Sequence, residues 1–166
     1  MKILIIFYSR GGTTRKMAEE IERGAKDAGA EIKLKETKNA GNEDLLWADG
    51  IIIGSPVYFG LPAAEIKKIF DDSLAVRGKL ENKIGAAFTS SYHPTGGKET
   101  TILSILQSML VHGMIVCGDP LKSGGHYGAA CSKFDERAKK ECYGLGKRVA
   151  ELAKKLKIGE QKIKLV

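Results

Sequence analysis

The sequence predicts an α/β protein in which helices cover both faces of a five-stranded parallel sheet. Two observations lead to this fold class. Short, almost wholly apolar segments recur along the chain, as is typical of central strands that are buried on both sides. Segments with apolar residues at every third or fourth position separate them, and this alternation indicates repeated strand–helix–strand units.

The strands are predicted from apolar runs that end in turn residues. The second run alternates Ile32 and Leu34 with charged residues, which is typical of an edge strand. The five runs lie at residues 2–9, 31–36, 50–55, 84–91 and 114–118. Right-handed crossovers, with the first strand between the second and third, give a doubly wound sheet in the order 2-1-3-4-5.

Four apolar stripes predict the helices between and after these strands. The stripes are formed by Met17, Ile21, Ala25 and Ala28; by Ile66, Ile69 and Phe70; by Ile102, Ile105, Leu106 and Met109; and by Phe134, Ala138, Cys142, Leu145, Val149, Leu152 and Leu156. Gly29 and Gly113 mark the ends of two of these helices. Pro62 is expected in the first turn of another, since that position needs no amide donor.

Length and composition favour one domain that spans residues 1–166. A chain of 166 residues with 43% hydrophobic content can bury a sizeable core, and no linker or repeat divides it. No apolar run reaches the roughly 18 residues that a membrane span needs, and the N-terminus does not resemble a secretory signal. We therefore expect a cytoplasmic protein with no membrane partner.

The charge and the cysteines narrow the classes of partner. The formal net charge is +7, and much of the excess lies in lysine clusters on the solvated face of the last helix. Anionic ligands are favoured, but no nucleic-acid-binding motif accompanies the charge, so we expect no specific nucleic acid. Cys117, Cys131 and Cys142 have no metal-binding or paired spacing, so we expect reduced thiols and no metal.

Three loops are expected to form one site. Ligands of doubly wound sheets bind beyond the carboxyl ends of the strands where the winding direction changes. The loops after the first, third and fourth strands should therefore converge there. They are residues 9–15, 55–62 and 90–99, which are rich in glycine, hydroxyl and aromatic residues.

The first of these loops has the composition of a phosphate-binding loop. Hydroxyl groups, close-approaching glycine backbone and the amino end of the following helix would all favour a bound phosphate. The residues are Ser9, Arg10, Gly11, Gly12, Thr13 and Thr14. Because the loop lacks the usual triphosphate and dinucleotide patterns, a terminal monophosphate fits best. The alternative is a simple tight turn followed by a helix that Thr13 caps.

The other two loops favour a planar ring beside the phosphate. Tyr58 and Phe59 lie on an irregular segment, and Tyr92 lies among small residues that permit close backbone approach. Together with the phosphate loop, these aromatic residues favour a flavin. The candidate ring contacts are Pro56, Val57, Tyr58, Phe59 and Gly60, followed by Ser90, Ser91, Tyr92, His93, Thr95, Gly96 and Gly97.

Four blocks of the sequence resemble a known family. They are YSRGGTTRKMA, GSPVYFGLPAAEIKKIFDD, TSSYHPTGGKETTILSILQSMLVHGM and SGGHYGA. Together they resemble the flavodoxin superfamily and, within it, the WrbA-like NAD(P)H:quinone oxidoreductases. The resemblance implies a flavodoxin-like three-layer sandwich that binds FMN, with NAD(P)H as reductant and a quinone or similar small molecule as electron acceptor. It also implies that residues 9–14 hold the phosphate. We further expect that the loop around Tyr127 closes over the flavin edge.

The chain departs from the family pattern in three places. Arg10 and Gly11 replace part of the usual threonine-rich phosphate loop. The segment after Phe70 is short and lacks a tryptophan of the quinone-contacting wall, and residues 36–48 are shorter than the family insertion associated with tetramers. A dimer or tetramer is therefore an open expectation. Two other functions also stay open: a flavodoxin-type electron carrier, against which the basic charge counts, and a non-catalytic FMN-dependent interaction module.

Three histidines are candidate catalytic residues. The resemblance implies that His112, which precedes Gly113, contacts the flavin, although a helix-terminal histidine can equally serve as a C-cap. Helix geometry also directs this end toward the amino ends of the strands. His93 and His126 lie in loops near the expected ring and are comparable candidates for proton donors or quinone contacts.

Overall fold

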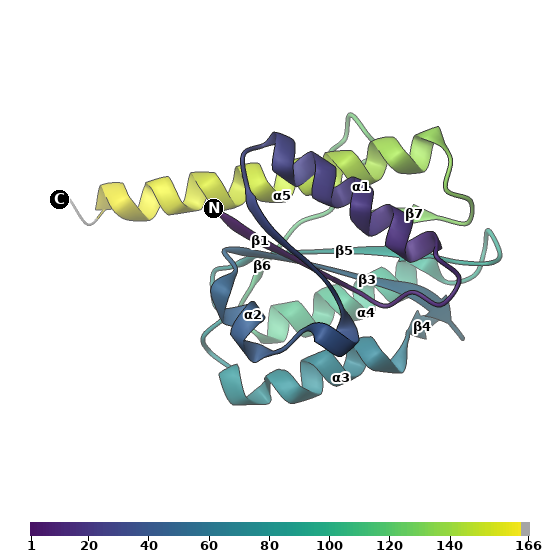
Figure 1. Cartoon of the computed structure of the whole chain (residues 1–166), viewed down its shortest axis with the longest axis horizontal. Coiled ribbons are helices and arrows are strands. Elements are labelled where there is room, and N and C mark those ends of the chain that lie inside the picture. The colour runs from purple at the N-terminus through teal and green to yellow at the C-terminus, as the bar shows by residue number, and fades with distance from the viewer. Residues whose placement is uncertain (164–166) are drawn as a thin grey trace.

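The computed structural model describes residues 1–163 and confirms the predicted α/β sandwich (Figure 1). The strands are β1 (Lys2–Phe7), β2 (Glu31–Glu36), β3 (Gly50–Tyr58), β4 (Leu61–Pro62), β5 (Ile84–Ser90), β6 (Ile115–Val116) and β7 (Ala129–Cys131). The α-helices are α1 (Thr13–Asp27), α2 (Asn42–Trp47), α3 (Ala64–Asp72), α4 (Lys98–Val111) and α5 (Glu136–Ile163). Two 3₁₀ turns, η1 (Thr37–Asn39) and η2 (Ser73–Val76), complete the described elements.

The main sheet is parallel, and its order β2-β1-β3-β5-β6 is the predicted order of the five principal strands. Its register places Phe7 of β1 opposite Gly54 of β3, and Gly54 opposite Phe88 of β5. The winding direction changes between β1 and β3, since β1 continues to β2 on one side and β3 to β5 on the other. The carboxyl ends of these strands therefore form the switch point at which a ligand is expected.

Alternating side chains of the central strands build two separate cores. Ile3, Ile5 and Phe7 of β1 face α1 and α5, where they meet Met17, Ile21 and Leu145 in one cluster. Leu4 and Ile6 face the opposite layer. There they pack with Leu45, Ile66, Ile69, Ile102, Ile105 and Met109 of α2, α3 and α4. The alternation has the period of two that a strand imposes, so each buried strand supports both helical layers.

Two local predictions differ from the structure. Pro62 does not lie in the first turn of α3, because it pairs with Val57 as part of β4 and the helix begins at Ala64. The fifth strand is also split in two. β6 pairs with the start of β5 and β7 with its end, and residues 117–128 make an excursion between them. Glycines and Pro120 in this excursion interrupt the regular pairing.

Helices α1 and α5 lie side by side on one face of the sheet (Figure 1). Their backbones approach so closely that a side chain on Gly24 of α1 would overlap with the carbonyl oxygen of Tyr143. In the same way, a side chain on Gly146 of α5 would overlap with the carbonyl oxygen of Ile21. The two glycines therefore fix the distance between the helices, and this distance fixes the position of α1 on the sheet.

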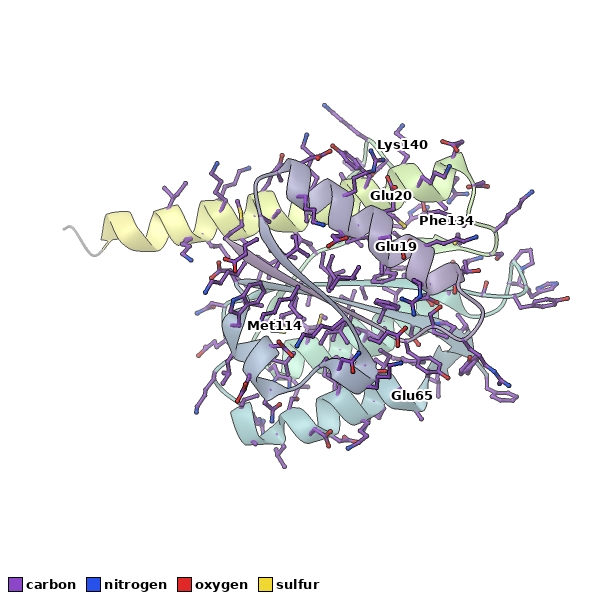
Figure 2. The ribbon with its side chains drawn as sticks, in the orientation of Figure 1. Glu19, Glu20, Glu65, Met114, Phe134 and Lys140 are labelled. Atoms are coloured by element: carbon purple, nitrogen blue, oxygen red, sulfur yellow. The ribbon has the colours of Figure 1, made fainter. Side chains whose placement is uncertain are left out.

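The outer surface of the α1–α5 layer is charged. Figure 2 labels Glu19 and Glu20 on α1 and Lys140 on α5, which lie on this outer side. The tightly packed part of α5 ends at Ala153, which is 3% exposed. The helix then continues beyond the amino end of β1 (Figure 1). Among residues 1–163, no helix combines the length and the apolar character that crossing a bilayer requires.

The glycine contact between α1 and α5 predicts opposite effects for two substitutions in one helix. Gly146→Ala should lower the free energy of unfolding by about 1–3 kcal/mol, because the added methyl group overpacks the contact. Gly159→Ala should cause no loss, because a side chain there would meet no atom within 4 Å and alanine favours the helix. Urea denaturation of both variants measures the difference. Equal stability of the two variants would contradict the assigned contact.

Candidate functional site

The three loops expected to converge do meet at the carboxyl ends of the strands. The hydroxyl oxygens of Thr14 in α1 and Ser90 in β5 lie 2.9 Å apart in a buried hydrogen bond. The hydroxyl of Thr100 in α4 donates to the carbonyl oxygen of Gly60 at 2.7 Å. These bonds join the first loop to the fourth-strand end and the third-strand loop to the start of α4.

The loop before α1 presents free backbone donors. Gly12 is the N-cap residue, with φ of +87°, and its side-chain-free backbone makes the turn possible. The Ser9 hydroxyl oxygen accepts hydrogen bonds from the amides of Gly12 and Arg15 at 3.2 and 3.3 Å. The Ser9 side chain, and not that of Thr13, therefore accepts from an amide of the first helical turn, and the Ser9 hydroxyl hydrogen remains available to another acceptor.

The first-turn amides of Thr13 and Thr14 have no hydrogen-bond partner in the part of the chain that the structure describes. No acidic residue lies in the first turn of α1, and Arg10 is exposed beside it. Arg15 pairs with Glu36, whose pKa is held below its ordinary value by hydrogen bonding to Lys38 and by the charge of Arg15. The loop therefore offers amide donors in a positive environment, which suits a phosphate.

A cluster of buried hydroxyl groups lies behind this loop. Its members are Thr14, Ser55, Thr89, Ser90 and Ser91, each at most 7% exposed. The Ser55 hydroxyl accepts from the amide of Ala63 at 2.8 Å, and the Thr89 hydroxyl donates to the Ser55 carbonyl at 2.7 Å. These bonds hold the strand ends and the following loops in register. Ser55 begins the predicted loop 55–62 and Thr89 lies near the end of the predicted fourth strand, but neither is a predicted flavin contact.

The third-strand loop is a tight hairpin with a strained aromatic residue at its tip. β3 and β4 pair antiparallel, and both connecting residues have positive φ, +51° for Phe59 and +78° for Gly60. Positive φ is rare for a bulky residue, and such strain is concentrated at functional sites. Phe59 is fully exposed, so packing against the core does not explain its position. Tyr58, in contrast, packs edge-on against Tyr8, with ring centroids 6.3 Å apart.

The fourth-strand loop presents a second free aromatic side chain. Tyr92 is fully exposed, and the loop ends at Gly97, whose φ is +90°. A side chain on Gly97 would approach the Cα of Gly60 to 2.9 Å, so the two loops touch through glycine backbone. The Thr95 amide donates to Nδ1 of His93 at 3.2 Å. The neutral His93 ring therefore carries its proton on Nε2, which points away from that contact.

A cavity lies beside this loop, at the open edge of the sheet. It has a volume of about 470 Å³ and is bounded by α4, β7 and the start of α5. His126 and Tyr127 line it together with Pro94 and Lys98, whereas no residue of the phosphate loop does. The buried Asp119 carboxylate accepts from the amides of Gly125 and His126 at 2.7 and 2.9 Å and so shapes this wall.

The structure does not bring His112 to these loops, contrary to the contact implied by the resemblance. His112 is the C-cap of α4 and precedes β6, so it lies at the amino ends of the strands. Its Nε2 lies 2.8 Å from the Ser73 hydroxyl, and its ring stacks on Phe70. Within one chain, α4 separates this residue from the loop at residues 91–97, as the direction of the helix requires.

The cysteines have no reactive surroundings at the site. Burial raises the pKa of Cys131 to about 11 and that of Cys142 well above its ordinary value. Burial also raises the pKa of Cys117. All three thiols are unpaired and stay protonated near neutral pH. None of the three thiols is therefore a candidate nucleophile at neutral pH.

The fold and the converging loops define a flavodoxin-like protein. The chain belongs to the NADPH-dependent FMN reductase family, whose model matches residues 1–127. It is an FMN-binding oxidoreductase that depends on NAD(P)H, as its family and several similar proteins indicate.

Individual relatives agree with this assignment. A flavodoxin of Aquifex aeolicus is 40% identical, over 90% of this chain and 85% of its own. An NAD(P)H dehydrogenase (quinone) of Archaeoglobus fulgidus is 37% identical, over 93% of this chain and 98% of its own. Among solved structures, a WrbA-like flavodoxin from Agrobacterium tumefaciens has a TM-score of 0.77 at 26% identity, over 93% of this chain and 98% of its own.

The surroundings of His112 predict a pH-dependent stability. Burial and the charge of Arg77 lower the pKa of His112 below 6.5 in the folded chain. Protons therefore favour the unfolded chain, and stability that is present above about pH 7 is lost as the pH falls through the unfolded value. His112→Gln should flatten this part of the profile. Urea titrations from pH 5 to 8 provide the measurement, and an unchanged slope in His112→Gln would contradict the assignment.

Proposed function

We propose that the chain is a single FMN-binding domain, residues 1–166, that uses NAD(P)H to reduce a quinone or a similar small acceptor. The observation that carries the proposal is the combination of free amide donors before α1 with exposed aromatic residues on the two neighbouring loops. These features meet at the switch point of one sheet. The two cores share the strands of that sheet, which supports a single domain.

The residues fit a flavin mononucleotide at its phosphate end. The amides of Thr13 and Thr14 and the hydroxyl of Ser9 would hold the phosphate, with Arg10 contributing positive charge. A side chain on Gly11 or Gly12 would meet no protein atom within 4 Å, so glycine leaves that space open and lets the phosphate approach the backbone. The positive φ of Gly12 also favours glycine. A phosphate there would satisfy donors that otherwise have no partner among the described residues.

The ring end would lie between the two aromatic loops. Residues 56–60 and 90–97 would line it, with Phe59 and Tyr92 as the candidate stacking side chains. The buried hydroxyl groups of Ser90 and Ser91 keep these loops fixed, because their bonds to Thr14 and Ser132 join separate elements. When bound, FMN supplies the hydride-accepting and electron-donating chemistry, and the protein supplies position and electrostatics.

The open side of the site suits alternating small molecules. Phe59 and Tyr92 are exposed, and the adjacent cavity of about 470 Å³ is within the size range of ligand pockets. His126 and Tyr127 line this cavity, and His93 precedes Pro94 of its lining. His93 and His126 are the proposed proton donors. His112 has no role in this proposal within one chain.

An electron carrier is the second candidate, and the similarity to the Aquifex flavodoxin favours it. A carrier needs FMN but no substrate pocket. The net charge of +7 argues against docking to basic redox partners, so we favour the reductase. We further propose a cytoplasmic location, which the three unpaired cysteines support, no specific nucleic-acid partner, and self-association as a dimer or tetramer.

The phosphate assignment predicts a selective loss of affinity. Ser9→Ala removes a donor to the phosphate and two acceptor contacts of the loop. A charge-assisted hydrogen bond contributes about 1.5–3 kcal/mol, so FMN should bind about 10- to 100-fold more weakly, while riboflavin binding changes little. Ser108→Ala, on the outer part of α4, is the control and should bind both as before. Flavin fluorescence quenching measures all four affinities, and equal losses for FMN and riboflavin would rule out the phosphate contact.

The proposed reaction predicts turnover without any partner protein. FMN-loaded protein with benzoquinone should oxidise NADH or NADPH, and the initial rates should give parallel double-reciprocal plots because two substrates alternate at one open site. Absorbance at the reduced-nicotinamide band follows the reaction, with FMN alone as the control. Tight FMN binding with a rate no higher than that of free FMN would instead identify an electron carrier.

A further inference from the structure

The tip of the β3–β4 hairpin has little support of its own. Phe59 and Gly60 both have positive φ, and the Phe59 side chain is fully exposed. One of the residue pairs that close the hairpin contains Pro62, which has no amide hydrogen to donate to β3. Phe59 also belongs to neither of the two cores. The hairpin alone therefore does not explain how a bulky residue is kept in a strained conformation.

A hydroxyl group in the first turn of α4 supplies the missing support. The Thr100 hydroxyl donates to the carbonyl oxygen of Gly60 at 2.7 Å and lies 2.9 Å from the carbonyl oxygen of Gly97. A hydroxyl group has one hydrogen, so the two carbonyl groups share it. Within the described residues, this is the only side-chain hydrogen bond that reaches residues 58–61. The carbonyl group of Gly60 is therefore tied to α4.

Glycine backbone lets the hairpin lie directly against the amino end of α4. A side chain on Gly97 would come within 2.9 Å of the Cα atom of Gly60 and 3.1 Å of the Thr100 hydroxyl oxygen. The contact between β4 and α4 is visible at the open end of the sheet (Figure 1). We call Gly60, Gly97 and Thr100 the hairpin clasp. The clasp joins the two loops between which the flavin ring is expected.

The position of the clasp indicates a role in the loops and not in the stability of the whole domain. Thr100 is exposed, and it belongs to neither core. A hydrogen bond at the surface replaces bonds to water, so its net contribution to folding is small. Removing the Thr100 hydroxyl should therefore leave the fold intact and release only the hairpin tip.

We propose that Thr100 is a positioning residue for the flavin ring. Its bond to Gly60 fixes the backbone on the carboxyl side of Phe59. On the amino side, the pairing of Tyr58 with Leu61 fixes the backbone within the sheet. The Phe59 ring is then held in place before the flavin binds. Such pre-organisation raises affinity, because less conformational freedom is lost on binding.

This inference rests on the proposed FMN site and concerns only its ring end. The clasp joins the loops after β3 and β5, whereas the proposed phosphate contacts lie in the loop before α1. FMN and riboflavin carry the same ring, so loss of the clasp should weaken both by the same factor. Ser9→Ala, in contrast, is expected to weaken FMN alone. The two ends of the site can therefore be distinguished by comparing the two flavins.

Flavin fluorescence titrations test the inference. Thr100→Val removes the hydroxyl and keeps the branched shape, so FMN and riboflavin should each bind about 2- to 10-fold more weakly, as expected for one lost hydrogen bond. Thr100→Ser keeps a hydroxyl and should restore most of the affinity. Ser104→Ala is the matched control, since its hydroxyl donates within α4, to the Thr100 carbonyl oxygen at 2.8 Å. This control should bind both flavins as the wild type does.

A double-mutant cycle tests whether Thr100 acts through Phe59. Phe59→Ala removes the ring that the clasp is proposed to hold. In that background, Thr100→Val should cause little further loss of flavin affinity, because residues that act as one unit have non-additive effects. A purely structural role of Thr100 would instead give the same loss with and without the Phe59 ring, and this result would contradict the proposal.

The possible results separate this inference from the proposed function. A wild-type chain that binds neither flavin would overturn the FMN site and the role of Thr100 together. Wild-type binding of FMN, with unchanged binding of both flavins in Thr100→Val, would overturn only the role of Thr100. A loss confined to FMN would do the same, as would a failure of Thr100→Ser to restore binding. If Thr100→Val does not fold, as judged by circular dichroism, Thr100→Ala provides the same test with a residue that favours the helix.

Discussion

The close packing of α1 against α5 is the constraint on which the rest of the site depends. The amino end of α1 is useful only if it points at the switch point between β1 and β3. Its position is fixed by the backbone contacts at Gly24 and Gly146, where larger side chains would force the helices apart. The apolar stripe of α1 then reaches the same core cluster as β1 and α5. A backbone contact far from the loops therefore determines where the free amides of Thr13 and Thr14 lie.

The site combines a rigid base with strained or exposed loop tips. Its base is the buried hydroxyl cluster, in which Thr14 bonds to Ser90 and Thr89 bonds to the backbone of Ser55. Its tips include Phe59, which has positive φ, and Tyr92, which is fully exposed. Neither the positive φ of Phe59 nor the exposure of Tyr92 stabilises the fold, and binding of a planar ligand would explain both. The base makes the strain tolerable, because hydrogen bonds at the ends of β3 and β5 fix the backbone beside it.

The distribution of charge divides the surface of the molecule into regions with different roles. Lysines concentrate on the outer face of α5, and arginines flank the loop before α1. α4, on the opposite face of the sheet, carries no charged residue after Glu99. The positive regions favour anionic ligands such as phosphate.

The sequence by itself determined the fold and most of the loops of the site. The apolar runs and helical stripes predicted the strands and helices, because burial on two faces and burial on one face leave different periodicities. The rule of right-handed crossovers then gave the strand order. Glycine and hydroxyl residues after the first and fourth strands predicted where the loops would meet, since parallel strands place their carboxyl ends together. The resemblance to flavodoxin-like proteins added the cofactor, which spacing and composition had only favoured.

Only the tertiary structure decided the features that depend on contacts between distant residues. It showed that Ser9 caps α1, that Ser55 and Thr89 belong to the hydroxyl cluster, and that the fifth strand is divided. It also placed the His112 ring beside Ser73 and Phe70, and His126 in the edge cavity. The sequence could not decide these points, because neighbouring residues set local periodicity, whereas the partner of a hydroxyl or imidazole group is chosen by elements that lie far away in the chain.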